Sequence, residues 1–295
     1  MNKRVKNAVL IPMNILYKFN PSVTLKLLYR LKTGRRLNLK SPKTYTEKIQ
    51  WLKLNYKSKL LPICTDKYTV RKYVKHCGCE NILTKLYWYG YDPSAIPFDD
   101  LPDQFVIKVT HGSGFNIICK NKQELDISAT TRVLKRWLTE KYLPCYGEWF
   151  YGVIKPRIIV EEYLDDGKGS SPKDYKFYCF HGEPKLINVH VDRFTNHKSI
   201  LLDVNWNPLK NIKMKEVDNS IKVEKPSELD ELLKYARILS KGFPHVRVDL
   251  YIVNSKIYFG ELSFTSDAGF VTISPIQTEE IIGEWLRIPS GGGNL

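Results

Sequence analysis

Helical spacing of apolar residues is clearest where polar caps precede it. Thr44 and Glu47 fit the capping-box pattern, and apolar residues then recur every three to four positions, so we expect a helix over 45–56. Comparable apolar faces predict three more helices, at 66–76, 131–142 and 227–240.

Runs of β-branched and aromatic residues predict strands in most of the remaining chain. The runs 105–109 and 115–119 flank His-Gly-Ser-Gly and predict one hairpin, and the runs 245–252 and 256–262 flank Val-Asn-Ser and predict another. Single strands are expected at 157–164, 175–180, 184–191 and 199–202. Hairpins, helices and antiparallel strands in this order predict an α+β fold.

The positive charge of the chain is concentrated near its start. Residues 1–60 contain fifteen of the 46 Lys and Arg residues but one of the 31 acids, so this segment carries +14 of the net charge of +15. Such a block favours an anionic partner, which could be a membrane leaflet, a nucleic acid or an acidic polymer.

The first apolar stretch, 8–19, is interrupted by Pro12, Asn14 and Lys18, so we expect neither a signal peptide nor a membrane span there. The six cysteines are scattered along the chain rather than paired in a pattern. Free thiols in the cytoplasm are therefore expected.

Lys108 lies inside an apolar strand that leads into a glycine-rich turn. A buried ammonium needs an anion near it, and Gly112 and Gly114 let backbone N–H groups approach such an anion closely. The pattern is neither a Walker loop nor a dinucleotide fingerprint. It indicates a phosphate-binding hairpin, with an ordinary β-turn beside a snorkelling lysine as the alternative.

Asp249 and Glu261 fall on the two strands of the second hairpin, where cross-strand pairing can bring their carboxylates together. Two carboxylates on one face are costly unless a cation bridges them. Arg247 shares the face of Asp249 by the period of two, and it could hold a transferred phosphate or simply pair with its neighbour.

Several motifs in one order, from about residue 27 to 270, resemble the TupA-like ATP-grasp family, which is associated with bacterial cell-surface polysaccharide synthesis. The motifs are Lys48-Ile-Gln-Trp51, Asp66-Lys67-Tyr68, Leu101-Pro-Asp-Gln-Phe-Val-Ile-Lys108, His111-Gly-Ser-Gly114, Pro156-Arg-Ile-Ile-Val-Glu-Glu-Tyr-Leu164, Asp174-Tyr-Lys-Phe177, Arg247-Val-Asp249 and Tyr258-Phe-Gly-Glu261. The resemblance implies an ATP-grasp fold, in which two α+β lobes clasp ATP, with a basic helical N-terminal extension.

On this resemblance the chain divides into four segments. Residues 1–60 form the basic helical segment and 61–104 an N-terminal lobe. Residues 105–164 form the lid subdomain with the glycine-rich hairpin, and 165–295 form the C-terminal lobe that carries the metal-binding acids.

The resemblance also implies ATP and Mg²⁺ as cofactors and assigns roles to the residues that match its motifs. Lys67 and Lys108 would hold the phosphates. A lid would consist of His111, Gly112, Ser113 and Gly114. A hinge that reads adenine would consist of Glu161, Glu162, Tyr163 and Leu164. Lys176 would point at the nucleotide, although an exposed strand lysine is the alternative.

The resemblance places Mg²⁺ between Asp249 and Glu261, with Arg247 as the third catalytic residue. Ser263 occupies a third ligand position where asparagine is common in ATP-grasp enzymes. This departure leaves the number of metal ions open.

The implied reaction is ATP-dependent carboxylate–amine ligation through an acyl phosphate. It would join an amino acid or another amine to the carboxylate of a uronic acid or an amino acid during synthesis of a capsule, an O-antigen or a teichuronic-type polymer, so the partners are a small amine and a carboxylate-bearing glycan or nucleotide sugar. His111, Asp192 and Arg193 are candidates for the acceptor side.

Two other readings stay open. One is a glycosyltransferase, although the chain contains no Asp-x-Asp triplet, and the other is a basic membrane or nucleic-acid adaptor without catalysis. We expect no nucleic-acid partner, and a cytoplasmic protein that docks through residues 1–60 on the inner face of the plasma membrane or on a polyanionic or lipid-phosphate-linked acceptor. The alternative is a solvated basic face with an N-terminal helix packed on the catalytic body.

Overall fold

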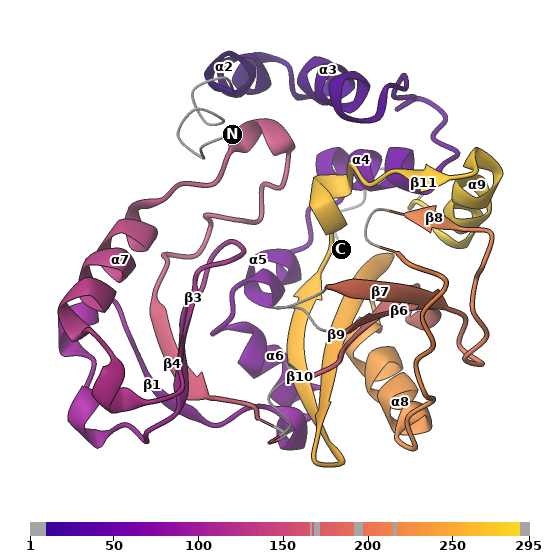
Figure 1. Ribbon diagram of the computed structural model, residues 1–295. Helices are drawn as coiled ribbons and strands as arrows, with labels where there is room; N and C mark the ends of the chain where they lie inside the picture. The colour runs from indigo at the N-terminus through magenta and orange to yellow at the C-terminus, as the bar shows by residue number, and fades with distance from the viewer. Residues whose placement is uncertain (1–9, 166, 168–171, 192–196, 215–216, 290–295) are drawn as a thin grey trace.

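A computed structural model of the chain describes residues 10–165, 167, 172–191, 197–214 and 217–289 (Figure 1). Its α-helices are α2 (Ile11–Phe19), α3 (Pro21–Thr33), α4 (Tyr45–Asn55), α5 (Leu60–Thr65), α6 (Val70–His76), α7 (Ile127–Thr139), α8 (Leu229–Ser240) and α9 (Ile276–Trp285). Its strands are β1 (Leu86–Gly90), β2 (Phe105–Val109), β3 (Asn116–Cys119), β4 (Ile158–Glu162), β5 (Asp174–Phe180), β6 (Glu183–Val191), β7 (Lys198–Leu202), β8 (Lys213–Met214), β9 (His245–Val253), β10 (Lys256–Ser263) and β11 (Ile273–Ser274).

The smaller main sheet has the order β1-β4-β2-β3, and all its pairs are antiparallel. Helix α7 covers it, and Leu134 of that helix is buried in one cluster with Phe105, Ile107 and Val160. Figure 1 shows this sheet and α7 on one side of the molecule, and α5 and α6 between it and the larger sheet.

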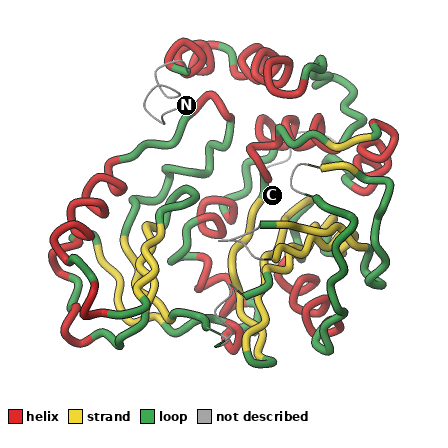
Figure 2. Tube along the Cα trace, viewed as in Figure 1, coloured by secondary structure: helices red, strands yellow, loops and turns green. Residues whose placement is uncertain are grey.

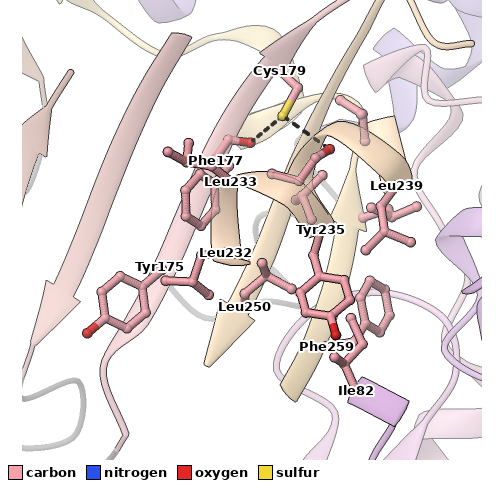
Figure 3. Packing of buried hydrophobic residues seen from close by; sticks show 14 of the residues in the cluster. Ile82, Tyr175, Phe177, Cys179, Leu232, Leu233, Tyr235, Leu239, Leu250 and Phe259 are labelled. Atoms are coloured by element: carbon pink, nitrogen blue, oxygen red, sulfur yellow. Dashed lines mark hydrogen bonds between the residues drawn. The ribbon is translucent and has the colours of Figure 1, made fainter. Parts of the chain in front are cut away.

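The larger sheet has the order β10-β9-β5-β6-β7, again fully antiparallel. Side chains of β5 alternate between its two faces, as the period of two requires. Phe177 and Cys179 pack in the cluster that contains Leu232 of α8 (Figure 3), and the thiol of Cys179 donates to the carbonyl oxygens of Phe177 and Ala236. Lys176 and Tyr178 therefore belong to the opposite face.

The opposite face of β5 is covered by α4 and α9. Tyr178 and Phe180 pack with Tyr45 and Ile49 of α4 and with Ile282 of α9. Helices α2 and α3 add an outer layer, whose inner residues pack around Phe270 and Cys145. Figure 2 shows the two helices along one edge of the molecule, away from the strands of both main sheets.

The structure confirms the α+β class and most of the elements expected from the sequence. The capping box is complete, since the Thr44 hydroxyl accepts from the Glu47 N–H and the Glu47 carboxylate accepts from the Thr44 N–H. The helix expected from residue 66 begins at Val70, because the Asp66 carboxylate accepts from the N–H groups of Tyr68 and Thr69 and holds a turn there.

Helix α7 and strand β1 also differ from what the sequence predicted. The helix expected at 131–142 is α7, which begins four residues earlier because Asp126 caps it by accepting from the Ala129 N–H at 2.7 Å. Strand β1 was not expected, and it pairs with β4 in the smaller sheet. The four segment boundaries drawn from the sequence remain predictions, although this pairing ties residues 86–90 to the sheet of the 105–164 segment.

Candidate active site

Two adjoining cavities lie where the smaller and larger sheets face each other. The first cavity, about 430 Å³, is lined by β2 and β4 on one side and by β9 and β10 on the other. The second cavity, about 640 Å³, is lined by β6, by the turn after β2 and by the segment that follows β10. Residues that line both cavities are Lys67, Ser113, Phe115, Lys176, Gly260 and Glu261.

The glycine-rich turn after β2 is connected to Lys67. Gly112 and Gly114 have φ angles of 72° and 79°, a region that glycine adopts without strain. The Lys67 N–H donates to the Thr110 carbonyl at 3.2 Å, and its Nζ donates to the Gly112 carbonyl at 2.8 Å. The turn and the lysine predicted to hold phosphates therefore lie together at the boundary of the cavities.

Lys67 also experiences the charge of Lys108. Burial lowers the pKa of Lys67, the Glu261 carboxylate opposes this effect, and the Lys108 ammonium lowers the pKa further. Both lysines line the first cavity, as the sequence predicted for a phosphate site. Two ammonium groups in one cavity repel each other, and an anion between them would relieve that repulsion.

The Lys108 ammonium of β2 forms an ion pair with Glu161, its diagonal neighbour on β4. The other Glu161 oxygen accepts from the Thr84 hydroxyl at 3.1 Å and lies 3.8 Å from the guanidinium of Arg71. Burial raises the pKa of the Glu161 carboxyl, but Lys108 and Arg71 outweigh burial and hold it below its usual range. Glu161 is therefore an anion that positions Lys108.

The rest of the predicted hinge lines the first cavity beyond the end of β4. Glu162, Tyr163 and Leu164 all contribute to its wall. The Glu162 carboxylate accepts from the Lys85 N–H at 3.2 Å. Because the Glu161 carboxylate is engaged by Lys108, Thr84 and Arg71, Glu162 is the hinge acid that remains accessible at this cavity.

Lys176 is buried, so the alternative of an exposed strand lysine is wrong, and its role toward the nucleotide stays a prediction. Its Nζ lies 2.6 Å from a carboxylate oxygen of Asp249 and 2.6 Å from one of Asp174. Burial would lower the pKa of Lys176, but the Asp249 carboxylate raises it above its ordinary value. Lys176 is thus held as a cation on the wall that both cavities share.

Asp249 and Glu261 are direct partners in the register of β9 and β10, as predicted. A single nitrogen, Nη2 of Arg247, lies 2.7 Å from Asp249, 3.1 Å from Glu261 and 3.0 Å from the Ser263 hydroxyl. The three predicted metal ligands therefore converge on one cationic atom. Burial would raise the pKa of Asp249, yet Arg247 and Lys176 lower it, so this ligand is an anion.

A bulge precedes Glu261. The register of β10 shifts between Phe259 and Glu261, and a Cβ atom on Gly260 would lie 2.7 Å from the Tyr251 ring and 3.0 Å from the Asp249 carbonyl oxygen. Only a residue without a side chain fits there. The bulge sets Glu261 at the boundary of the two cavities.

His111 was predicted to contact the nucleotide, but it lines the second cavity instead of the first. Its Nε2 is 2.8 Å from the Glu140 carbonyl oxygen and its ring packs against Phe115. This position agrees with its other predicted role, on the acceptor side. The remaining acceptor candidates, Asp192 and Arg193, lie outside the described residues.

The second cavity contains polar groups that the sequence did not single out. Nδ1 of His190 and Nε2 of His197 are 2.7 Å apart, with stacked rings. Glu148 is buried in the wall, where Thr265 donates to its carboxylate, and burial raises its pKa although Lys53 opposes this.

Among the residues that the structure describes, no group of three or more His, Cys, Asp and Glu side chains is arranged to hold a metal by itself. Asp249 and Glu261 supply two carboxylates and Ser263 a hydroxyl. This set fits Mg²⁺, which is commonly held by one or two carboxylates together with phosphate oxygens of the substrate.

Sequence reasoning missed Arg71 and Thr84 at the first cavity and did not assign a role to Asp174. Arg71 follows Lys67 by four residues, the spacing of one turn in the helix that the sequence predicted from residue 66. Asp174 precedes Lys176 by two, on the same face of β5. Both spacings are visible in the sequence. The contact of Thr84 with Glu161 depends on tertiary structure and has no local signal.

The sequence of residues 47–287 matches the family described as TupA-like ATPgrasp. The chain belongs to this family. The ATP-grasp fold expected from the motifs is thereby confirmed. Among curated proteins, none matches the chain.

Solved structures of ATP-grasp and ligase proteins are similar to the chain at low identity. D-alanine–D-alanine ligase from Bacillus anthracis has a TM-score of 0.44 at 18% identity, covering 70% of this chain and 59% of that one. ATP-grasp ligase PsnB has a TM-score of 0.40 at 13% identity, covering 74% and 57%. A RimK domain protein from Sphaerobacter thermophilus has a TM-score of 0.42 at 9% identity, covering 76% and 67%. The chain thus spans less than two thirds of the two ligases.

Proposed function

We propose that the chain is an ATP-dependent carboxylate–amine ligase. The observation that carries this proposal is the meeting of two cavities at Lys176 and Glu261. One cavity suits a nucleotide, and the other is large enough for further substrates. A group transferred from the nucleotide to an acceptor has to cross such a boundary.

The first cavity combines the two surfaces that ATP requires. Val106, Ile159 and Phe259 give it apolar walls for a base, and the Glu161–Leu164 segment supplies backbone groups at the end of β4. Lys67, Lys108 and Lys176 supply three cations for the phosphates. The turn at Gly112–Gly114 would fold over the phosphates and exclude water.

Mg²⁺ would be held by Asp249 and Glu261, with Ser263 as a hydroxyl ligand. When bound, it would neutralise the charge of the phosphates during transfer. When no metal is present, the Arg247 guanidinium takes the place of the metal and contacts all three ligands. Once the metal binds the carboxylates, this guanidinium would be free to bind a phosphate.

The second cavity would bind the carboxylate and the amine. Lys176, Arg247 and the His190–His197 pair offer donors for an anionic substrate, and Glu148 offers an acceptor for an amine. Donors and acceptors on one wall suit two substrates of unlike charge.

The reaction that fits these groups has two displacements. A carboxylate oxygen of the substrate attacks the terminal phosphorus of ATP, the bond to the bridging oxygen breaks, and ADP leaves. The amine nitrogen then attacks the acyl carbon of the acyl phosphate, the carbon–oxygen bond breaks, phosphate leaves, and the amine loses a proton. No covalent nucleophile on the protein is needed, because positioning and charge neutralisation accelerate phosphoryl transfer.

For the substrates, we extend the proposal to a uronic-acid or amino-acid carboxylate and an amino acid or other amine, joined in the cytoplasm during synthesis of a bacterial cell-surface polysaccharide. The TupA-like family supports this class, and the donors of the second cavity are compatible with a sugar acid.

The experiment is a product analysis with the full chain. Protein, ATP and Mg²⁺ are incubated with panels of uronic acids, amino acids and amines, and ADP, AMP and phosphate are quantified. We expect ADP and phosphate only when both a carboxylate and an amine are present, and none with Glu261→Gln. The exposed control Glu224→Gln should retain the rate. Sugar transfer from a nucleotide sugar without ATP consumption would instead favour a glycosyltransferase.

A further inference from the structure

The outer face of α2 and α3 is apolar and exposed. Six large apolar side chains lie on it with 40% to 83% of their surface exposed: Ile11, Ile15, Phe19, Val23, Leu27 and Leu31. They follow one another at intervals of four residues, so each helix carries one continuous row. The opposite sides of the same helices pack in the cluster that contains Phe270 and Cys145, with buried residues on α3 and partly buried ones on α2.

Cations flank these rows. Lys18 lies beside the row of α2, and Lys26 and Arg30 lie beside the row of α3, at positions adjacent to it on the helical wheel. Lys18, Lys26 and Arg30 are all exposed. Residues 10–46 contain no Asp or Glu. An apolar row bordered by cations is typical of helices that lie in the interface of a membrane.

We infer that the outer face of α2 and α3 docks on an anionic lipid bilayer. The apolar rows enter the boundary between headgroups and acyl chains, and Lys18, Lys26 and Arg30 pair with lipid phosphates. This inference does not rest on the ligase activity proposed above.

Charge and shape favour a bilayer over other partners. In a symmetric dimer, a second copy would bring the same cations of α2 and α3 against each other, which costs free energy. A nucleic acid would satisfy the cations but leave the six apolar side chains in water. An anionic bilayer satisfies both sets at once.

The docking is peripheral. Helices α2 and α3 have 9 and 13 residues, and within the described residues no helix has the length and apolar character needed to cross a bilayer. Binding should therefore be reversible and weakened by salt.

Helix α2 also contacts the segment that forms one wall of the second cavity. The Asn14 side chain accepts from the Cys145 N–H at 3.0 Å, and Tyr146, which follows, lines that cavity. A bilayer at α2 and α3 would thus lie one helical layer away from the proposed acceptor site.

The test is co-sedimentation of the full chain with vesicles of phosphatidylcholine, with and without phosphatidylglycerol, at low and high salt. A charge variant removes the flanking cations: Lys18→Gln, Lys26→Gln, Arg30→Gln. An apolar variant removes part of the rows: Ile15→Ser, Leu27→Ser, Leu31→Ser. Matched controls change exposed residues elsewhere: Lys225→Gln, Lys234→Gln, Lys241→Gln, and Val153→Ser, Ile281→Ser.

We expect binding to vesicles that contain phosphatidylglycerol, falling as salt rises. The partition coefficient should drop about fivefold for each cation removed, or on the order of 100-fold for the charge variant. The apolar variant should lose on the order of tenfold. Both controls should bind like the wild type, and all variants should keep their melting temperature.

Three outcomes would overturn the inference. They are no binding to anionic vesicles at low salt, unchanged binding by the charge and apolar variants, and equal losses in the matched controls. Binding to duplex DNA that survives in the apolar variant, without vesicle binding, would assign the cations to nucleic acid instead.

Discussion

Arg247 holds Asp249 in a bidentate ion pair, with Nε 2.7 Å from Oδ1 and Nη2 2.7 Å from Oδ2. The same Nη2 contacts Glu261 and Ser263. A cationic side chain therefore occupies the point where three oxygen ligands meet. Metal binding and release of Arg247 from these ligands should be coupled.

The first prediction concerns this coupling. Arg247→Gln removes the internal cation, and two neighbouring carboxylates favour a bridging cation. Without nucleotide, we expect the variant to bind Mn²⁺ more tightly than the wild type, by about tenfold or more, while turnover falls. Calorimetric titration with Mn²⁺ measures the affinity. If adding Glu261→Gln to this variant leaves Mn²⁺ affinity unchanged, the three oxygens are not the metal site.

The second prediction concerns the stability of the buried charge cluster. Asp249→Asn leaves the Arg247 and Lys176 cations without their shared anion, so the free energy of unfolding should fall by about 3–5 kcal/mol. Glu261→Gln, whose side chain is half-exposed, should lose less than about 1 kcal/mol. Urea denaturation measures both.

The difference in the free energy of unfolding between the wild type and Asp249→Asn should also depend on pH. Because the pKa of Asp249 is lowered in the folded state, its stabilising effect is present above the pKa of the unfolded carboxyl and is lost as pH falls through the folded pKa. The difference between wild type and Asp249→Asn should shrink below about pH 4. An equal difference at neutral and acidic pH would show that Asp249 is not held as an anion.

The third prediction concerns Lys53, whose ammonium is buried against the carbonyl oxygens of Tyr146 and Ala268 at 2.7 Å each. Burial lowers the pKa of Lys53 to about 7. Above that pH the unfolded chain binds more protons than the folded chain, so the contribution of Lys53 to the free energy of unfolding rises with pH until the unfolded lysine titrates.

Lys53→Met removes this dependence. Raising the pH from 7 to 9 should shift the stability difference in favour of the wild type by about 1–3 kcal/mol, measured by urea denaturation. Buried thiols and phenols that do not interact with Lys53 act equally on both proteins and cancel in the comparison. The Cys145 thiol does interact with Lys53, which lowers the pKa of that thiol, so both proteins carry Cys145→Ala in this measurement. A difference that stays flat across this range would mean that Lys53 remains charged in the folded protein.

The fourth prediction concerns Gly260. An alanine there would place Cβ against the Tyr251 ring and the Asp249 backbone, so the hairpin has to shift. We expect a loss of about 1–3 kcal/mol in the free energy of unfolding and weaker ATP binding. Adding Tyr251→Ala should recover only the part due to the ring. Unchanged ATP affinity in Gly260→Ala would show that the bulge does not position the site.

The elements that the sequence predicted best are those with local signals. The capping box at Thr44 follows from spacing alone. The pairing of Asp249 with Glu261 was predicted from their places on the two strands of one hairpin, but their exact register also depends on the bulge at Gly260, which was not predicted. Strand β1 was missed because its residues are only partly buried and its pairing with β4 contains a bulge, so its pattern does not alternate cleanly.

The sequence predicted which residues form the site, but it did not predict which side chains they contact. The pairing of Lys108 with Glu161 depends on the contact of β2 with β4, which are tens of residues apart in the sequence. The position of His111 at the second cavity depends on how the two sheets meet. The second cavity itself has no sequence signal, because Glu148 and the His190–His197 pair come from separate segments of the chain.

The most direct test of ATP-dependent acyl activation is hydroxylamine trapping. The full chain is incubated with ATP, Mg²⁺, hydroxylamine and each candidate carboxylate, and hydroxamate and nucleotide products are measured together. The account predicts a hydroxamate formed in equal amount with ADP, and none with Glu261→Gln. AMP and pyrophosphate as products, or ADP release without hydroxamate for a carboxylate that the enzyme ligates, would contradict it.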